Sequence, residues 1–135
     1  MAEPVVTTKH EAKKSVLVID DDPKMRELIS DILEPFDFKV VHAESSEEGL
    51  TLALIATPDA VLCDLMLPDA LGFETAKALG QYPATQNVPI IFITGYPYME
   101  EYAINPNWRL LLKPFSMSTL VNTVRDAIAS ATPAA

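Results

Sequence analysis

Five short apolar runs without polar alternation recur along the chain, a pattern typical of strands buried on both faces of a parallel sheet. Residues that break regular structure, or the start of a helical pattern, bound each run. The predicted strands are Ser15–Asp20, Lys39–Ala43, Ala60–Cys63, Val88–Ile93 and Leu110–Leu112. The run Ala60–Cys63 is the most informative, because it stops abruptly at a single carboxylate, Asp64.

A helical apolar period follows the first predicted strand. Asp22 suits the N-cap position and Pro23 the first helical position. The apolar stripe of this predicted helix comprises Met25, Leu28, Ile29, Ile32 and Leu33. The pair Glu34-Pro35 is expected to end the helix, because proline cannot donate the next backbone hydrogen bond.

Ser45 and Glu48 have the spacing of a capping box and predict a second helix, which Thr57-Pro58 stops. Its inward-facing residues are predicted to be Leu50, Leu54 and Ile55. A capped helix between two buried strands is the unit that joins neighbouring parallel strands.

Shorter helical patterns fill the later connections. Phe73–Leu79 is predicted to be a helix that Gly80 ends, and Ser116 is predicted to cap the last helix. The apolar stripe of that last helix comprises Met117, Leu120, Val121, Val124 and Ile128. A helix of about two turns over Met99–Ile104 has room between two prolines.

Strands that alternate with helices predict an α/β fold, with a doubly wound, five-stranded parallel sheet and helices on both faces. One domain over residues 15–129 is expected, preceded by a flexible leader (1–14) and followed by a frayed tail (130–135). The 135 residues suffice for one core and show no internal repeat.

The charge balance narrows the classes of partner. With 10 Lys and Arg against 19 Asp and Glu, the net charge of −9 argues against nucleic acid or an anionic membrane as a direct partner. A cytoplasmic location is expected, because no secretory signal or apolar run near ~20 residues occurs. The single cysteine, Cys63, lies inside an apolar run and is predicted to be a buried, unreactive thiol.

Polar side chains stand where four of the predicted strands end: Asp20 and Asp21, Asp64, Thr94, and Lys113. Each of them alone has an ordinary structural explanation, such as a cap or a solvated charge. Together they converge on the carboxyl edge of the sheet, where open α/β sheets bind ligands.

Three clustered carboxylates require a cation or raise one another's pKa values. An all-oxygen site with few protein ligands suits Mg²⁺, and a carboxylate beside it can attack a phosphoryl group to form an acyl phosphate. Lys113 and the Thr94 hydroxyl are candidate donors to the transferred phosphoryl oxygens, and the small Gly95 leaves room for them.

Four sequence blocks resemble the signature blocks of the receiver domain of two-component response regulators. They read VLVIDDDPKMR, VLCDLMLPDALG, IIFITG and LLLKPF, and the likeness covers roughly Ser15–Ala129. The resemblance implies a flavodoxin-like (βα)5 fold of the single-domain type. It also implies that Asp64 is the phosphoacceptor and that Mg²⁺ is the cofactor.

The resemblance assigns further roles residue by residue. Asp20 and Asp21 match the acidic pair that holds Mg²⁺, and the backbone carbonyl of Met66 completes the protein ligands beside Asp64. Thr94 matches the switch hydroxyl and Lys113 the lysine of the family, whose bond to the following proline is expected to be cis.

Three departures from the family pattern concern the output surface. Leu110 stands where the family usually has Tyr or Phe, and Trp108, which shares its strand parity, is the candidate to replace that ring. Leu71 replaces an Asp in the loop after the phosphoacceptor, and the stretch between Thr94 and Lys113 is a few residues shorter than usual.

The expected partner is a histidine kinase or a histidine phosphotransfer protein, with signalling by protein contact. The chain is interpreted as a stand-alone receiver or the receiver fragment of a longer protein. The face Gly95–Ile128 is a candidate homodimer surface. Its first part, Gly95–Trp108, is the candidate switch segment, with Tyr98 and Tyr102 as contact or core-filling rings.

Two alternative functions remain open at this stage. A haloacid-dehalogenase-like phosphatase also uses an Asp nucleophile, but it needs a second Asp two residues later, where this chain has Met66. A phosphorylation-independent interaction module on a receiver fold is favoured slightly by Leu110 and opposed by the complete set of acids.

Overall fold

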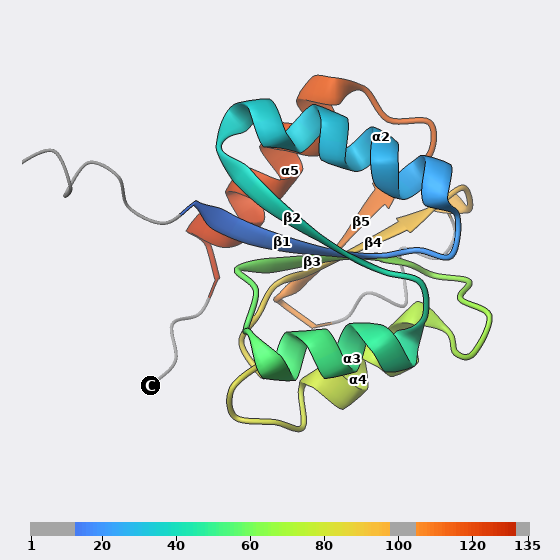
Figure 1. Ribbon diagram of the computed structural model, residues 1–135, viewed down its shortest axis with the longest axis vertical. Coiled ribbons are helices and arrows are strands. Elements are labelled where there is room, and N and C mark those ends of the chain that lie inside the picture. The colour runs from blue at the N-terminus through green and yellow to red at the C-terminus, as the bar shows by residue number, and fades with distance from the viewer. Residues whose placement is uncertain (1–12, 98–104, 132–135) are drawn as a thin grey trace, which may run out of the picture.

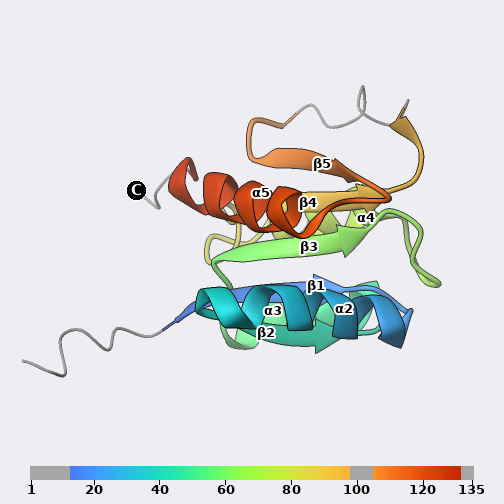
Figure 2. The ribbon, with the colours of Figure 1, turned by 90° about the horizontal axis from the view of Figure 1, so that it is seen from above.

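The computed structural model describes residues 13–97 and 105–131. Its centre is a five-stranded sheet in the order β2-β1-β3-β4-β5, in which every neighbouring pair is parallel. The strands are β1 (Lys14–Ile19), β2 (Phe38–Ala43), β3 (Ala60–Asp64), β4 (Ile90–Thr94) and β5 (Trp108–Leu112). Their carboxyl ends all lie at one edge of the sheet (Figure 2).

Helices cover both faces of the sheet, as the sequence predicts. They are α2 (Pro23–Leu33), α3 (Ser46–Ile55), α4 (Gly72–Leu79) and α5 (Met117–Ala129), with a short 3₁₀ turn, η1 (Glu34–Phe36), after α2. Helices α2 and α5 lie on one face and α3 and α4 on the other (Figure 1). The predicted doubly wound, flavodoxin-like fold is therefore confirmed.

Some predicted features lie outside the described residues. These are the helix Met99–Ile104, the rings of Tyr98 and Tyr102, and most of the predicted leader and tail. Strand β1 begins at Lys14, one residue inside the range predicted as leader. Among the described helices, none is both long and apolar enough to cross a membrane.

Two hydrophobic clusters, one on each face, form the core. Beneath α2 and α5, the buried residues include Val16, Val18, Leu62, Ile91 and Ile93 of the sheet. Beneath α3 and α4 they include Leu17, Ile19, Val61, Cys63 and Phe92. Because successive side chains of a strand point to opposite faces, each central strand contributes to both clusters, and this explains its unbroken apolar sequence.

The predicted helix starts have the expected caps. Asp22 accepts a hydrogen bond from the Lys24 amide at 2.9 Å. Ser116 accepts one from the Thr119 amide at 3.1 Å. Gly80 follows the last residue of α4. These local signals therefore place the helices with an error of about one residue.

The capping box of α3 differs from the predicted one in a detail. The Ser45 hydroxyl accepts from the Glu48 amide at 3.1 Å, as expected. The Glu48 carboxylate, however, accepts from the Glu44 amide at 2.7 Å, one residue before the N-cap. Both first-turn interactions still stabilise the start of the helix.

The predicted inward face of α3 is confirmed for Leu50, which packs partly buried against the cluster beneath α3 and α4, and is wrong for Leu54 and Ile55. Leu54 and Ile55 are 40% and 75% exposed, while Gly49 and Ala53 are buried against the sheet. A Cβ atom on Gly49 would lie only 2.4 Å from Cδ1 of Ile19. The helix therefore approaches the sheet most closely through its small residues, with Leu50 and Leu52 packed beside them, while Leu54 and Ile55 are left on the outer surface.

Two other apolar positions differ from the prediction, and two strands begin two residues away from their predicted starts, β4 later and β5 earlier, at Trp108. Leu28 of α2 and Met117 of α5 are 46% and 60% exposed, because they lie at the margin and at the first turn of their helices. Strand β4 begins at Ile90, two residues later than predicted, because the Val88 amide instead bonds the Thr85 carbonyl in a turn.

Candidate functional site

The sheet brings the predicted polar residues to its carboxyl edge. Asp20 and Asp21 follow β1, Asp64 ends the adjacent β3, Thr94 ends β4, and Lys113 follows β5. The three carboxylates can each offer an oxygen within 4.8 Å of the others, a spacing that could hold one metal ion. Parallel pairing thus assembles residues that are more than forty positions apart in sequence.

Asp20 is the buried member of the acidic group, with only 1% of its surface exposed. Its Oδ1 accepts from the Asp22 amide at 2.9 Å, but its Oδ2 is buried without a hydrogen-bond partner. Burial is the main cause that raises the pKa of Asp20, and the charge of Asp64 adds to it. An orphaned buried carboxylate oxygen is costly, so this atom fits a site that a cation completes.

Asp64 is half-buried and is oriented by its own loop. The Met66 amide donates to Oδ1 of Asp64 at 3.1 Å. Burial is again the main cause that raises the pKa of Asp64, while the Met66 amide and the positive charge of Lys113 lower it. One carboxylate oxygen is thereby held in place, and the site favours an added positive charge or a proton.

Thr94 and Lys113 lie side by side at the ends of β4 and β5. Thr94 is 4% exposed, and its hydroxyl oxygen accepts from the Tyr96 amide at 3.1 Å, which leaves the hydroxyl proton able to donate. The Lys113 amide donates to the Thr94 carbonyl at 2.8 Å. The peptide bond between Lys113 and Pro114 is cis, as the resemblance implies.

The two glycines of the site differ in the space around them. A Cβ on Gly95 would meet no atom within 4 Å, in keeping with room beside Thr94 for a phosphoryl-sized group. A Cβ on Gly72 would lie 2.8 Å from the carbonyl oxygen of Asp64 and 3.1 Å from the Leu65 Cα. Helix α4 therefore begins in close contact with the backbone that carries Asp64.

Two residues that the sequence did not single out contact this region. The Arg26 guanidinium of α2 donates to the backbone carbonyl of Asp20. The carboxylate of Asp69 accepts from the amides of Ser46 and Glu47 at the start of α3. Arg26 lies one turn inside the helix that Asp22 caps. This position shortly after the acidic pair is the only feature of the sequence that indicates a contact between Arg26 and Asp20. Asp69 carries no comparable signal.

Leu110 and Trp108 point to the same face of the sheet, as their parity predicts, and both pack against the cluster beneath α3 and α4. Trp108 lies at the start of β5, away from the site, with its ring centroid 5.4 Å from that of Phe92 and 6.0 Å from that of Phe73. This packing favours the interpretation that Trp108 fills core space.

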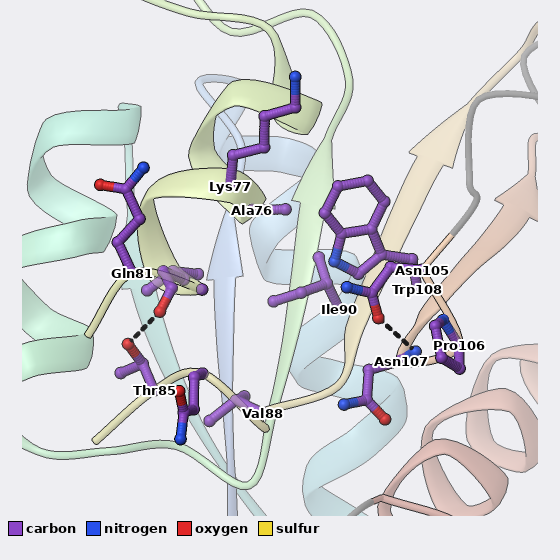
Figure 3. Close-up of a pocket in the computed structure, with 13 residues that line it drawn as sticks. Ala76, Lys77, Gln81, Thr85, Val88, Ile90, Asn105, Pro106, Asn107 and Trp108 are labelled. Atoms are coloured by element: carbon purple, nitrogen blue, oxygen red, sulfur yellow. Dashed lines mark hydrogen bonds between the residues drawn. The ribbon is translucent and has the colours of Figure 1, made fainter. Parts of the chain in front are cut away.

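A hollow of about 550 Å³ lies at the opposite edge of the sheet, where β4 and β5 begin (Figure 3). The Trp108 ring, Gln81 and the turn Asn105–Asn107 line it. Hydrogen bonds from Thr85 to the Leu79 carbonyl and within the turn stabilise its walls. None of the acidic residues, Thr94 or Lys113 lines this hollow, so it is separate from the candidate site.

The chain is similar to known regulatory proteins of bacteria. PhoB of Pseudomonas aeruginosa, a phosphate regulon transcriptional regulatory protein, is 33% identical over 82 residues, or 61% of this chain and 36% of PhoB. DivK of Brucella ovis, a polar-differentiation response regulator, is 26% identical over 121 residues, or 87% of this chain and 98% of DivK. The chain thus spans only about a third of PhoB but nearly all of DivK.

Among solved structures, the chemotaxis response regulator CheY4 of Vibrio cholerae has a TM-score of 0.78 at 28% identity, with 85% of this chain and 98% of CheY4 covered. The family model of the response regulator receiver domain matches residues 16–125, which include every candidate residue at the carboxyl edge of the sheet. The chain therefore belongs to the receiver-domain family of two-component response regulators.

Proposed function

We propose that Asp64 accepts a phosphoryl group from a phosphohistidine of a histidine kinase or a histidine phosphotransfer protein, and that the phosphorylated chain signals by protein contact. The observation that carries this proposal is the position of Asp64, half-buried at the end of β3 with Asp20 and Asp21 within reach of one shared cation. Receiver domains are the signalling domains that take phosphoryl groups from histidine kinases, and this membership supports the proposal.

In the proposed step, the Asp64 carboxylate oxygen that does not bind the Met66 amide attacks phosphorus. A P–O bond forms, the P–N bond to the histidine breaks, and its electron pair returns to the imidazole nitrogen. Lys113 and the Thr94 hydroxyl then donate to the phosphoryl oxygens, and the space beside Gly95 accommodates them. The Met66 amide keeps the other Asp64 oxygen in place during the attack.

The proposed cofactor is Mg²⁺, held by Asp20, Asp21, Asp64 and the carbonyl of Met66. The donor set supports it, because carboxylate and carbonyl oxygens suit this hard cation and Oδ2 of Asp20 is buried without a partner. When bound, Mg²⁺ supplies positive charge that offsets both the acidic cluster and the phosphoryl oxygens.

Labelling with acetyl phosphate tests this function. Wild type with Mg²⁺ is expected to gain one phosphoryl group by intact mass, and Asp64→Asn none. Asp21→Ala is expected to bind Mg²⁺ much more weakly in a calorimetric titration. Labelling of Asp64→Asn equal to wild type would contradict the assignment of the nucleophile, and no labelling of wild type would favour a phosphorylation-independent interaction module.

A matched control comes from the neighbouring acid Asp22. It caps α2 through the Lys24 amide, so Asp22→Ala is expected to cost about 0.5–2 kcal/mol of stability and to leave labelling intact. Loss of labelling in Asp22→Ala after correction for unfolded protein would show that the acidic pair is assigned to the wrong residues.

A further inference from the structure

The loop after Asp64, residues 65–72, folds back on itself as a small hairpin. The Gly72 amide donates a hydrogen bond to the Leu65 carbonyl at 2.8 Å, and the Leu67 amide donates one to the Ala70 carbonyl at 3.1 Å. An isolated β-bridge also joins Met66 and Leu71. Met66, whose amide orients Asp64, lies at the base of the hairpin and Asp69 lies at its tip. Because the hairpin is closed by these contacts, the position of the tip also constrains the base.

Asp69 ties the tip of the hairpin to helix α3. Its two carboxylate oxygens accept from the Ser46 amide at 2.9 Å and from the Glu47 amide at 3.1 Å. These amides belong to the first turn of α3, where a helix has unsatisfied donors and favours negative charge. Helix α3 thus has two caps: Ser45, adjacent in sequence, binds the Glu48 amide, and Asp69 comes from the phosphoacceptor loop.

The start of α3 is in turn connected to the acidic pair. The Asp20 amide donates at 3.0 Å to the carbonyl of Ala43, the last residue of β2, only three residues before Ser46. The Asp69 hydrogen bonds therefore complete a continuous series of contacts between Asp64 and Asp20. The series runs from Asp64 through the hairpin to the first turn of α3, and then through the end of β2 to Asp20. Asp20 and Asp64 are thus connected in two ways, through the sheet and through the contacts of Asp69.

A separate contact holds α3 against α4. The hydroxyls of Ser46 and Thr75 lie 2.6 Å apart and are buried. This contact does not involve the Asp69 carboxylate, so its removal leaves the two helices joined while it releases the hairpin tip and frees the Ser46 and Glu47 amides. The effect of such a change is therefore expected in the phosphoacceptor loop and the first turn of α3, with the packing of α3 on α4 retained.

We propose that Asp69 is a positioning residue of the phosphoryl site. By accepting the first two amides of α3, it fixes the hairpin that carries Met66 and so sets the affinity of the acidic cluster for Mg²⁺. This inference rests on the proposed function. Since Asp69 acts through the loop, its removal is expected to weaken Mg²⁺ binding by about threefold to tenfold, less than the ~10–100-fold typical of groups bonded directly to a metal ligand.

The test compares wild type with Asp69→Ala, Asp69→Asn and Ser45→Ala by calorimetric Mg²⁺ titration, thermal unfolding and amide hydrogen exchange. Asp69→Ala is expected to weaken Mg²⁺ binding and to speed exchange of the Leu67 amide even without metal. Asp69→Asn, which keeps one acceptor, is expected to be intermediate. Ser45→Ala removes the other cap of the same helix, so it is expected to lower the unfolding midpoint with unchanged Mg²⁺ affinity.

The outcomes separate the inference from the function on which it rests. Wild-type Mg²⁺ affinity and Leu67 exchange in Asp69→Ala would overturn the inference alone. An equal loss of affinity in Ser45→Ala would overturn it too, because the effect would then come from the stability of α3. If Asp69→Ala does not fold, the comparison of Asp69→Asn with Ser45→Ala decides. A wild type that binds no Mg²⁺ would refute both the proposed function and the inference.

Discussion

Asp20 combines burial with a carboxylate oxygen that has no partner, so its ionised form is disfavoured in the folded protein. Its pKa is raised above the unfolded value, mainly by burial. A raised pKa means that the folded state holds the proton more tightly than the unfolded state. This residue therefore lowers the stability of the metal-free protein as the pH rises from about 4 through the folded pKa.

The first prediction concerns Asp20→Asn measured without Mg²⁺. The variant keeps an acceptor for the Asp22 amide but cannot ionise, so at neutral pH it is expected to be more stable than wild type. The difference in unfolding free energy is expected to shrink as the pH falls toward ~4. Urea unfolding at several pH values measures it, and a difference independent of pH would contradict this account.

A second prediction concerns the lifetime of the acyl phosphate. Met66 and Tyr96, two residues after Asp64 and Thr94, are 59% and 53% exposed beside the site, and neither side chain is a good base to orient a water molecule. We expect the phosphoryl group to be lost slowly compared with receivers that have polar, water-orienting residues at these two positions. The double variant Met66→Asn with Tyr96→Glu is expected to change the rate of phosphoryl loss severalfold. Identical decay by intact mass in wild type and the double variant would argue against this role.

The residues that carry the proposed chemistry could be predicted from the sequence because each follows a recognisable strand. Asp64, Thr94 and Lys113 were placed in this way, and the parallel sheet brings them together as predicted. Asp69 could not be, because its partners are the amides of another element more than twenty residues away. A loop aspartate has the same local sequence whether it faces solvent or caps a distant helix.

At the scale of elements, helix α4 begins against the backbone of the phosphoacceptor strand. The third prediction is that Gly72→Ala destabilises the protein by about 1–3 kcal/mol, because its Cβ would lie 2.8 Å from the Asp64 carbonyl oxygen and one backbone segment must shift. Slower labelling of Asp64 is also expected, since that segment carries the nucleophile.

Gly80→Ala provides the matched control at the other end of the same helix. Its Cβ would approach no atom closer than 3.4 Å, and its backbone is in the right-handed helical region, so this change is expected to be neutral or slightly stabilising. Denaturant unfolding measures both variants. Equal stabilities of Gly72→Ala and Gly80→Ala would contradict the close approach at Gly72.

The elements themselves could be predicted where local signals agree. Caps at Asp22, Ser45 and Ser116 and the apolar runs gave boundaries within about two residues. The inward face of α3 could be predicted only in part from hydrophobicity, because almost all of its second half is apolar. Only the geometry of packing on Ile19 selects the small side over the large one. Hydrophobicity therefore identifies Leu50 correctly but not Leu54 and Ile55, because the closest approach to the sheet is made by Gly49 and Ala53.

At the scale of the whole molecule, the chain has a net charge of −9, and three of its carboxylates lie close together at one site. The fourth prediction is that Mg²⁺ stabilises the fold by binding the native state alone. At a concentration one hundred times the dissociation constant the gain is about 2.7 kcal/mol, which raises the unfolding midpoint by several degrees.

Two controls separate specific binding from general screening of charge. NaCl at the same ionic strength is expected to give a much smaller shift of the unfolding midpoint, because it screens only exposed charges. Asp21→Ala is expected to lose most of the Mg²⁺ response. A response to Mg²⁺ that is the same in Asp21→Ala as in wild type would mean that the stabilisation does not come from the acidic cluster.

The burial of Cys63 has a practical consequence for labelling chemistry. This thiol is 1% exposed, its pKa is raised by burial, and it is the only cysteine of the chain. Maleimide dyes, which react with accessible thiolates, should leave the native protein unmodified. A cysteine introduced at an exposed position such as Ser118 would then take a dye or spin label at one defined place, with the natural cysteine retained. Conversely, modification of Cys63 itself would report opening of the central strand.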